Sequence, residues 1–404
     1  MRPLRGPVHA LSQASQASNG SACPNFLIVD VAYATSKSAV CARTHRWRPT
    51  LKVISKIATA SAVLAALTLP VSSSYAQALS SVGAGATTLH KSTPAKNASV
   101  SDAALVKSLP GFRNGYAEVD GVRLHYVVGG KGAPLILLPG WPETWWTFHK
   151  IMPSLAEQHT VIAVDLRGMG SSSRPVDGYD KKTMARDIYE LVQSLGYDKA
   201  SVAGHDIGSA VAFAYAENYP QAIDKLVMME LPHPDDSLMS FPLLPAQGAF
   251  SDKLGTARPY LWWFAFNQVQ GLPEKLLAGR IRVEQDWLFN YFLLDAGSID
   301  ARDRAVYEQA YNTADAIRAS NAWYQAFPQD VIDNKEYGTL QMPVLALGGP
   351  AYGWMKKVVA QKTANLTALK VENSGHFIQE EQPEFVARTM IDFLQGDQQS
   401  APKS

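Results

Sequence analysis

Cysteine is nearly absent from this chain of 404 residues: there are two, Cys23 and Cys41, and both lie within the first 56 residues. The sequence after residue 78 therefore offers no disulfide, no thiol nucleophile and no cysteine-bound metal. A glycine-rich phosphate-binding loop and internal repeats are also missing. The residues left to carry chemistry are carboxylates, histidines and aromatic side chains.

An excess of positive charge is missing from most of the chain. Residues 1–56 hold eight Lys and Arg against one acid, whereas the rest holds 29 basic and 35 acidic residues, a net charge of −6. This mildly acidic body gives no support for nucleic-acid binding. With 47% hydrophobic and 18% charged residues, the chain is long enough for one large domain with an insertion or for two smaller domains.

No apolar run is long enough for a typical membrane-spanning helix. The longest, 57–71, follows the basic stretch 46–56 and precedes small residues with cleavage positions after Ala76 or Ala78. This order is typical of a secretory signal peptide, so we expect residues 1–78 to be a leader, with the signal at about 46–78. A buried helix or a membrane anchor is the alternative. The prediction is a secreted or periplasmic protein with no membrane attachment after signal removal.

Beyond the leader, the pattern changes from a linker to alternating strands and helices. Residues 79–102 are rich in Ser, Ala, Gly and Thr and predict a flexible linker. Asp120-Gly121 between two alternating segments predicts a hairpin. Short apolar runs that end in Gly, Asp, Glu or His predict strands buried on both faces, at 133–140, 159–168, 199–206, 223–230, 342–349 and 366–376. Helical patterns lie at 182–195, 208–219 and 383–394.

This alternation predicts an α/β fold with a mostly parallel central sheet, formed by residues 103–231 and 335–397 and followed by a short tail, 398–404. Residues 232–334 interrupt the alternation with an aromatic-rich, helical pattern. The simplest interpretation is a helical cap inserted over the carboxyl edge of the sheet. Open α/β sheets place their sites at that edge.

The clearest local signal for chemistry is "SVAGHDIGSAV", residues 201–211. A buried strand ends, small residues Gly204 and Gly208 flank Asp206, and a helix begins. This spacing predicts the sharp strand-to-helix turn called a nucleophile elbow, which pushes the central side chain into the site. With Asp206 at the centre, attack on carbon forms an alkyl ester. The alternative is that Asp206 only caps the following helix.

An ester on Asp206 needs a base to activate water, and His376 follows the last predicted strand. The acid that orients such a base commonly lies after the strand 342–349, yet residues 342–371 contain no Asp or Glu. Glu230, at the end of the preceding strand, is therefore the predicted acid, with Asp235 and Asp236 as weaker substitutes. A structural histidine and a solvated carboxylate are the alternatives.

The remaining histidines are less suited to the base. We expect His205, next to the predicted nucleophile, to point away from the site, and His149 to be structural. His125 lies within an early strand, and His233 opens the cap.

Attack on carbon also requires a donor to the leaving atom, and the cap offers aromatic candidates. Tyr324 can donate and lose a proton, whereas Trp263 can donate but keeps its proton. Tyr260 is a further candidate. The alternative for each is a packing role within the cap.

Taken together, these motifs resemble the α/β-hydrolase superfamily, specifically its branch of epoxide hydrolases and dehalogenases, from about residue 111 to 394. They are most similar to secreted bacterial epoxide hydrolases of the Cif type. The segments that carry the likeness are "LPGWPETWWTFHKIMPSL", "VIAVDLRGMGSSSRP", "GYDKKTMARDI", "VAGHDIGSAVAFAYA", "LVMMELPHPD", "AGR" and "SGHFIQEEQPE". The resemblance implies an α/β-hydrolase fold with an inserted helical cap.

By motif position, the resemblance implies that Asp206 opens an epoxide whose oxygen is held by Tyr324 and a second cap donor, at Trp263. Family members carry Tyr or His at this second position, so Trp263 departs from the pattern. It further implies that the backbone N–H groups of Trp141 and Ile207 stabilise the oxyanion. Pro139 stands where the family carries His, which removes one side-chain support from the turn.

The expected function is hydrolysis of an epoxide to a vicinal diol, with no metal or cofactor and a small apolar epoxide as the partner. Dehalogenation of a haloalkane or haloacid by the same Asp206 is the alternative within the family. It is less favoured because Ile207 stands where haloalkane dehalogenases carry a halide-binding Trp and haloacetate dehalogenases carry Arg. A non-catalytic secreted binding protein is the alternative from another class. A homodimer is one candidate assembly.

Overall fold

The computed structural model describes residues 99–249, 251–254 and 259–396. These residues form an eight-stranded sheet with strand order β1-β2-β4-β3-β5-β6-β7-β8. β1–β2 and β2–β4 pair antiparallel, and every other neighbouring pair is parallel. The strands are β1 Phe112–Val119, β2 Val122–Gly130, β3 Ala133–Leu138, β4 His159–Val164, β5 Ala200–His205, β6 Ile223–Met229, β7 Leu340–Gly348 and β8 Thr363–Lys370. The predicted mostly parallel sheet is confirmed.

The predicted hairpin joins β1 to β2. Val119 pairs with Val122 across a two-residue turn, and both turn residues have positive φ, 47° at Asp120 and 78° at Gly121. A turn with two positive φ angles matches the twist of the strands, and Asp-Gly is a favoured pair for it.

The central strands are apolar throughout because helices cover both faces of the sheet. In β3, Ile136 and Leu138 pack into one hydrophobic core, whereas Leu135 and Leu137 pack into the other. Helices α3, α4 and α12 contribute to the first core, and α1, α2 and α14 to the second. Their bounds, with the short elements beside them, are α1 Asp102–Val106, η1 Trp145–Phe148, α2 Met152–Ala156, α3 Lys181–Ser194, α4 Ile207–Asn218, α12 Tyr352–Val359, η3 Ala360–Lys362, α13 Ile378–Glu381 and α14 Pro383–Gln395.

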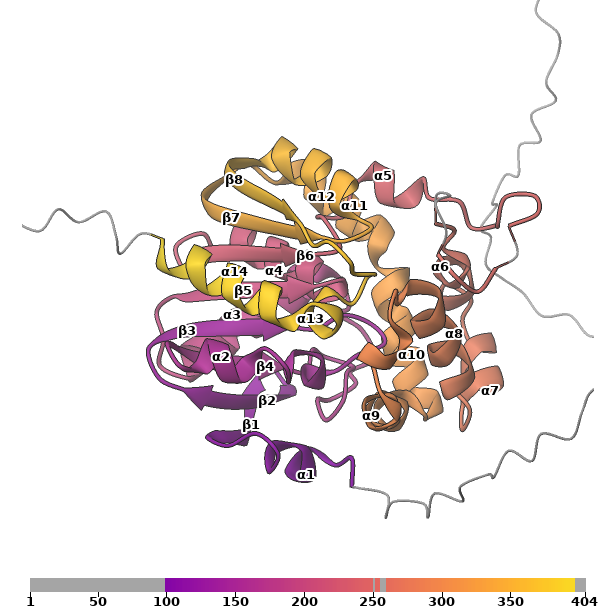
Figure 1. Cartoon of the computed structure of the whole chain (residues 1–404), viewed down its shortest axis with the longest axis horizontal. Helices are drawn as coiled ribbons and strands as arrows, with labels where there is room; N and C mark the ends of the chain where they lie inside the picture. Colours follow the sequence, from indigo (N-terminus) through magenta and orange to yellow (C-terminus); the bar gives the residue numbers. More distant parts are fainter. Residues whose placement is uncertain (1–98, 250, 255–258, 397–404) are drawn as a thin grey trace, which may run out of the picture. The chain divides into compact units, whose positions relative to one another are not determined.

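The helices inserted between β6 and β7 gather at one end of the sheet (Figure 1). This is the carboxyl end of the parallel strands, because residues that follow β5 and β6 share a cavity with cap residues. The elements are α5 Asp236–Met239, α6 Trp262–Asn267, α7 Leu272–Leu277, α8 Arg282–Phe292, η2 Ala296–Ser298, α9 Ala301–Tyr311, α10 Ala314–Gln325 and α11 Phe327–Glu336.

A buried ion pair joins the cap to the sheet's helix layer. Lys181, at the start of α3, places its Nζ 2.8 Å from Asp330 Oδ2 on α11 and 2.8 Å from the Trp323 carbonyl oxygen on α10. The Lys181 backbone N–H also donates to Asp330 Oδ1, at 2.7 Å. Both side chains are 2% exposed. A paired and hydrogen-bonded charge of this kind strongly resists separation, because each partner alone would remain buried and uncompensated.

The predicted leader and signal peptide, most of the predicted linker and the tail lie outside the described residues, and they stay predictions. α1 begins at Asp102, the last residue of the predicted linker, and is packed against β1. Within the described part of the chain, no helix has the length and apolarity to cross a membrane.

Candidate active site

The turn between β5 and α4 has the geometry of the predicted elbow. Asp206 adopts φ 50° and ψ −122°, a strained conformation that side chains rarely occupy. A Cβ added at Gly204 would lie 2.1 Å from the Gly208 carbonyl oxygen, and one at Gly208 would lie 2.1 Å from the Leu138 carbonyl oxygen. The Asp206 side chain makes no capping hydrogen bond with α4. It is therefore presented to the cavity by a tightly packed turn.

Gly208→Ala is expected to destabilise the fold by about 1–3 kcal/mol, because the new methyl group meets a backbone carbonyl that cannot rotate away. Urea unfolding of the purified protein measures this loss. Gly353→Ala is the matched control, since Gly353 is also helical and has open space around it. We expect that control to be neutral or slightly stabilising. Equal stability of the two variants would contradict the close packing of the elbow.

Asp206, His376 and Glu230 form a connected set. His376 Nε2 lies 3.6 Å from Asp206 Oδ2, and His376 Nδ1 lies 3.3 Å from Glu230 Oε2. The other Asp206 oxygen, Oδ1, accepts from the Trp141 backbone N–H at 3.2 Å, and the nearby Ile207 N–H helps to lower the pKa of this carboxylate. The structure thus brings together the predicted nucleophile, base, acid and both predicted oxyanion donors.

Charge coupling within this set fixes the resting protonation states. Burial alone would lower the pKa of His376, but hydrogen bonds and attraction from Asp206 and Glu230 raise it to about 10. Burial would likewise raise the pKa of Asp206, yet the His376 imidazole, His205 and the Ile207 N–H hold it below its usual value. At neutral pH the resting site therefore contains an ionised Asp206 beside an imidazolium.

Glu230 reaches His376 from the residue directly after β6. It adopts φ 62° and is 3% exposed, and its second oxygen accepts from the Gly349 N–H at the end of β7. The segment after β7, which contains no acidic residue up to position 371, thus contributes a backbone N–H that holds Glu230. The two weaker substitutes are engaged elsewhere, since Asp235 caps α5 and Asp236 pairs with Lys335.

His205 points away from the cavity and supports the base from behind. Its Nε2 donates to the His376 carbonyl oxygen at 2.9 Å, and its Nδ1 lies 2.9 Å from Glu143 Oε2. Glu143 is fully buried and also accepts from Thr147 and Gln379. The sequence reasoning did not single out Glu143. The signal that could have found it is a lone acid within the otherwise apolar and aromatic stretch 139–146.

The other histidines serve structural roles in this geometry. His149 stacks on Trp146 with ring centroids 4.2 Å apart, and burial lowers its pKa. His233 stacks on Phe213, and burial lowers its pKa to about 4. Both rings are outside the residues that line the cavity.

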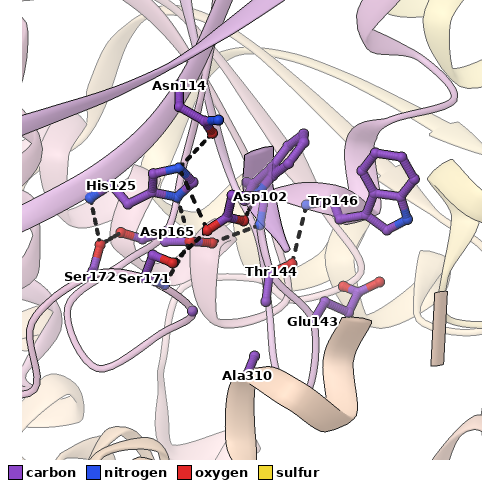
Figure 2. Close-up of polar contacts among 12 residues, drawn as sticks. Asp102, Asn114, His125, Glu143, Thr144, Trp146, Asp165, Ser171, Ser172 and Ala310 are labelled. Carbon is purple, nitrogen blue, oxygen red and sulfur yellow. Dashed lines mark hydrogen bonds and ion pairs between the residues drawn. The ribbon is translucent and has the colours of Figure 1, made fainter. Parts of the chain in front are cut away.

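The turn that presents Trp141 is anchored on the far side by a buried polar network, shown in Figure 2. Asp165, after β4, accepts from the Trp145 N–H at 2.9 Å and from His125 Nδ1 at 2.8 Å. Asp102 of α1 accepts from Trp145 Nε1 at 2.8 Å. Burial would lower the pKa of His125, but Asp165 raises it. These bonds and Glu143 hold the segment after Pro139, where the family's histidine is absent.

Tyr324 of α10 and Trp263 of α6 line the same cavity as Asp206. Burial raises the pKa of Tyr324 well above 10, and the Asp206 charge adds to this effect, while a hydrogen bond with Trp263 opposes it. The phenol therefore keeps its proton at neutral pH. Tyr260 is not among the residues that line the cavity; its hydroxyl donates to the Ser251 carbonyl oxygen at 3.3 Å.

The cavity has a volume of about 470 Å³ and a mainly apolar wall. Among the described residues that line it, the ionisable side chains are Asp206, Glu230, Tyr324 and His376, and none is Lys or Arg. A compact apolar molecule with one hydrogen-bond acceptor fits this environment. The apolar and aromatic residues of the wall include Leu231, Leu238, Phe241, Leu254, Leu261, Phe264, Leu288, Phe292, Trp354 and Phe377.

Two clusters place three possible metal ligands close together, Asp102–His125–Asp165 and His149–Asp303–Glu380. Neither lines the cavity, and their carboxylates already accept hydrogen bonds from protein groups. They are structural ties between elements.

Residues 133–383 match a family model described as the alpha/beta hydrolase fold. The chain is 35% identical over 286 residues to the soluble epoxide hydrolase of Corynebacterium sp. (strain C12), covering 69% of this chain and 96% of that protein. It is 28% identical over 299 residues to a fluoroacetate dehalogenase of Burkholderia sp, covering 70% and 94%. The crystal structure of the Cif epoxide hydrolase from Acinetobacter nosocomialis is similar at a TM-score of 0.65 and 25% identity, covering 70% of this chain and 90% of that one.

Proposed function

The chain belongs to the α/β-hydrolase family, in its branch of epoxide hydrolases and dehalogenases, and it is a hydrolase; from this premise we propose that it opens epoxides to vicinal diols through an ester on Asp206. One observation carries the proposal. Asp206 and Tyr324 line one mainly apolar cavity, and no Lys or Arg of the described residues is in its wall. A carboxylate nucleophile and a proton donor in the same cavity match the two ends of a C–O bond that must be opened.

Ring opening begins with attack of Asp206 Oδ2 on an epoxide carbon. Oδ1 accepts from the Trp141 N–H, which leaves Oδ2 as the nucleophilic atom. As the epoxide C–O bond breaks, the phenol of Tyr324 protonates the ring oxygen. The Trp263 indole acts to lower the pKa of Tyr324, so its role is to stabilise the phenol oxygen as negative charge develops there.

Ester formation prepares the second step by changing the charge next to His376. Esterification removes the Asp206 negative charge, and with it two of the contributions that raise the pKa of His376. The imidazole then loses its proton more easily and accepts one from water. Glu230 continues to orient Nδ1. The hydroxide attacks the ester carbonyl carbon, whose oxygen Oδ1 becomes an oxyanion bonded to the Trp141 and Ile207 N–H groups.

Dehalogenation of an uncharged haloalkane is the second candidate. It is favoured by the Trp141 indole N–H, which is buried and has no hydrogen-bond partner among the described residues. A haloacid fits less well, because no Lys or Arg of the described residues lines the cavity to hold its carboxylate.

A panel of epoxides and haloalkanes separates these reactions. Purified protein is incubated with each compound, and diol formation and halide release are measured separately. We expect diols from small apolar epoxides and little halide release. Halide release without diol would reverse the assignment. Binding of these compounds without either product would favour a non-catalytic binding protein.

A further inference from the structure

Three buried cap residues on the helices that carry Trp263, Leu288 and Tyr324 have polar side-chain atoms without a hydrogen-bond partner among the described residues. Both side-chain polar atoms of Asn267, Nδ2 of Asn321 and Oε1 of Glu284 make no hydrogen bond with any described residue. The three residues are 1%, 2% and 5% exposed. Buried polar atoms are normally hydrogen-bonded, and internal water is the usual partner when protein groups are absent.

The helix geometry brings these side chains to Tyr324. Asn267 is one turn beyond Trp263 on α6, and Asn321 is one turn before Tyr324 on α10, so each pair shares a helix face. The Gln325 side chain donates to the Asn267 carbonyl oxygen at 3.1 Å, which joins α6 to α10. On α8, Glu284 is one turn before Leu288, which lines the cavity.

Glu284 acts on Tyr324 electrostatically but is paired with no charge of its own. Its negative form would raise the pKa of Tyr324, and burial is the one cause that raises the pKa of Glu284, to about 8. The charged groups on α8 and α9 are engaged with one another, Arg282 with Asp286 and Glu308, and Arg304 with Asp286. α6 carries no ionisable residue, and α7 carries Glu274 and Lys275.

We propose that Glu284 is a positioning and proton-supplying residue for Tyr324, acting as a neutral carboxylic acid in a closed polar compartment formed with Asn267 and Asn321. This inference rests on the proposed epoxide hydrolysis. As the phenol gives its proton to the ring oxygen, Glu284 gives one to the phenol through a bound water, the usual partner of buried polar atoms that no protein group satisfies. The negative charge then resides on a carboxylate, which is a weaker base than a buried phenolate.

The protons balance over the cycle. His376 first releases its own proton to solvent, then takes one proton from the attacking water and passes it to the alkoxide released from the ester. The regenerated Asp206 carboxyl gives its proton to His376, and Glu284 regains one from solvent. The net reaction consumes one epoxide and one water and produces one diol.

The test measures ester formation on Asp206 in a His376→Gln background, by intact mass against time. Adding Glu284→Gln, which keeps the size of the side chain but cannot supply the proton, is expected to slow ester formation about tenfold or more. In the His376→Gln protein, the rate of ester formation is expected to fall as pH rises through about 8. In the double variant that also carries Glu284→Gln, this fall is expected to be absent. Glu308→Gln removes a cap carboxylate on α9 and is the control expected to have no effect.

An unchanged rate and pH profile with Glu284→Gln would overturn the role of Glu284. A flat profile between pH 7 and 9.5 in His376→Gln alone would overturn it as well, and this measurement does not depend on the folding of the Glu284 variant. Complete absence of an ester from every epoxide would instead refute the proposed function, and with it the role of Glu284 in that reaction.

Discussion

Asp206→Ala is expected to reduce diol formation by about 10⁴-fold or more, because Glu230, the other carboxylate among the described lining residues, is already engaged with the Gly349 N–H and His376. Steady-state turnover of the best epoxide measures this loss. The same substitution removes the carboxylate 3.6 Å from His376, so the pKa of His376 should fall below its value of about 10. NMR titration of the imidazole checks the sign of that change.

Asp177→Ala, which removes an exposed acid far along the chain from the elbow, is the matched control and should retain full activity. Thermal unfolding of both variants shows whether the fold is intact. Substantial turnover by a folded Asp206→Ala protein would remove Asp206 from the mechanism, whatever the behaviour of His376.

His376→Gln is expected to divide the reaction into its two steps. Ring opening does not need a base, since Asp206 is already ionised, but ester hydrolysis does. The protein should therefore gain the mass of one epoxide and then turn over at least about a hundredfold more slowly. Intact-mass spectrometry followed by peptide mapping should locate the added group on Asp206.

The double variant Asp206→Ala, His376→Gln is the control and should gain no mass. An adduct that still forms there would identify a different nucleophile. Full turnover by His376→Gln without accumulated ester would show that another group activates the water.

Much of the fold follows from local pattern. The strands are continuous apolar runs because both faces are covered, and Asp120-Gly121 marks the hairpin because its φ angles suit that pair. Around the elbow, Gly204 and Gly208 are required because a Cβ at either position would lie only 2.1 Å from a backbone carbonyl oxygen. Such constraints act between residues close in sequence or on adjacent strands, so local sequence patterns can predict them.

The supports of the site are much harder to predict, because they depend on contacts between distant segments. Glu143 meets His205 across 62 positions, and the environment of Glu284 is created by three separate cap helices. The effect of Trp263 on the pKa of Tyr324 is equally impossible to predict from sequence, because the two residues lie on different cap helices. Alternation and motif spacing carry no information about how cap helices pack against one another.

The ion pair between Lys181 and Asp330 has a mechanical consequence. Lys181 also holds the carbonyl of Trp323, the residue before Tyr324, so the proton donor is tied to the α3 side of the molecule. Any movement of the cap that keeps this ion pair intact therefore leaves the α10–α11 junction in place. The α5–α6 side of the cavity wall is held differently, because the Leu254 N–H donates to the Tyr291 carbonyl oxygen and the Phe241 ring packs against Trp354.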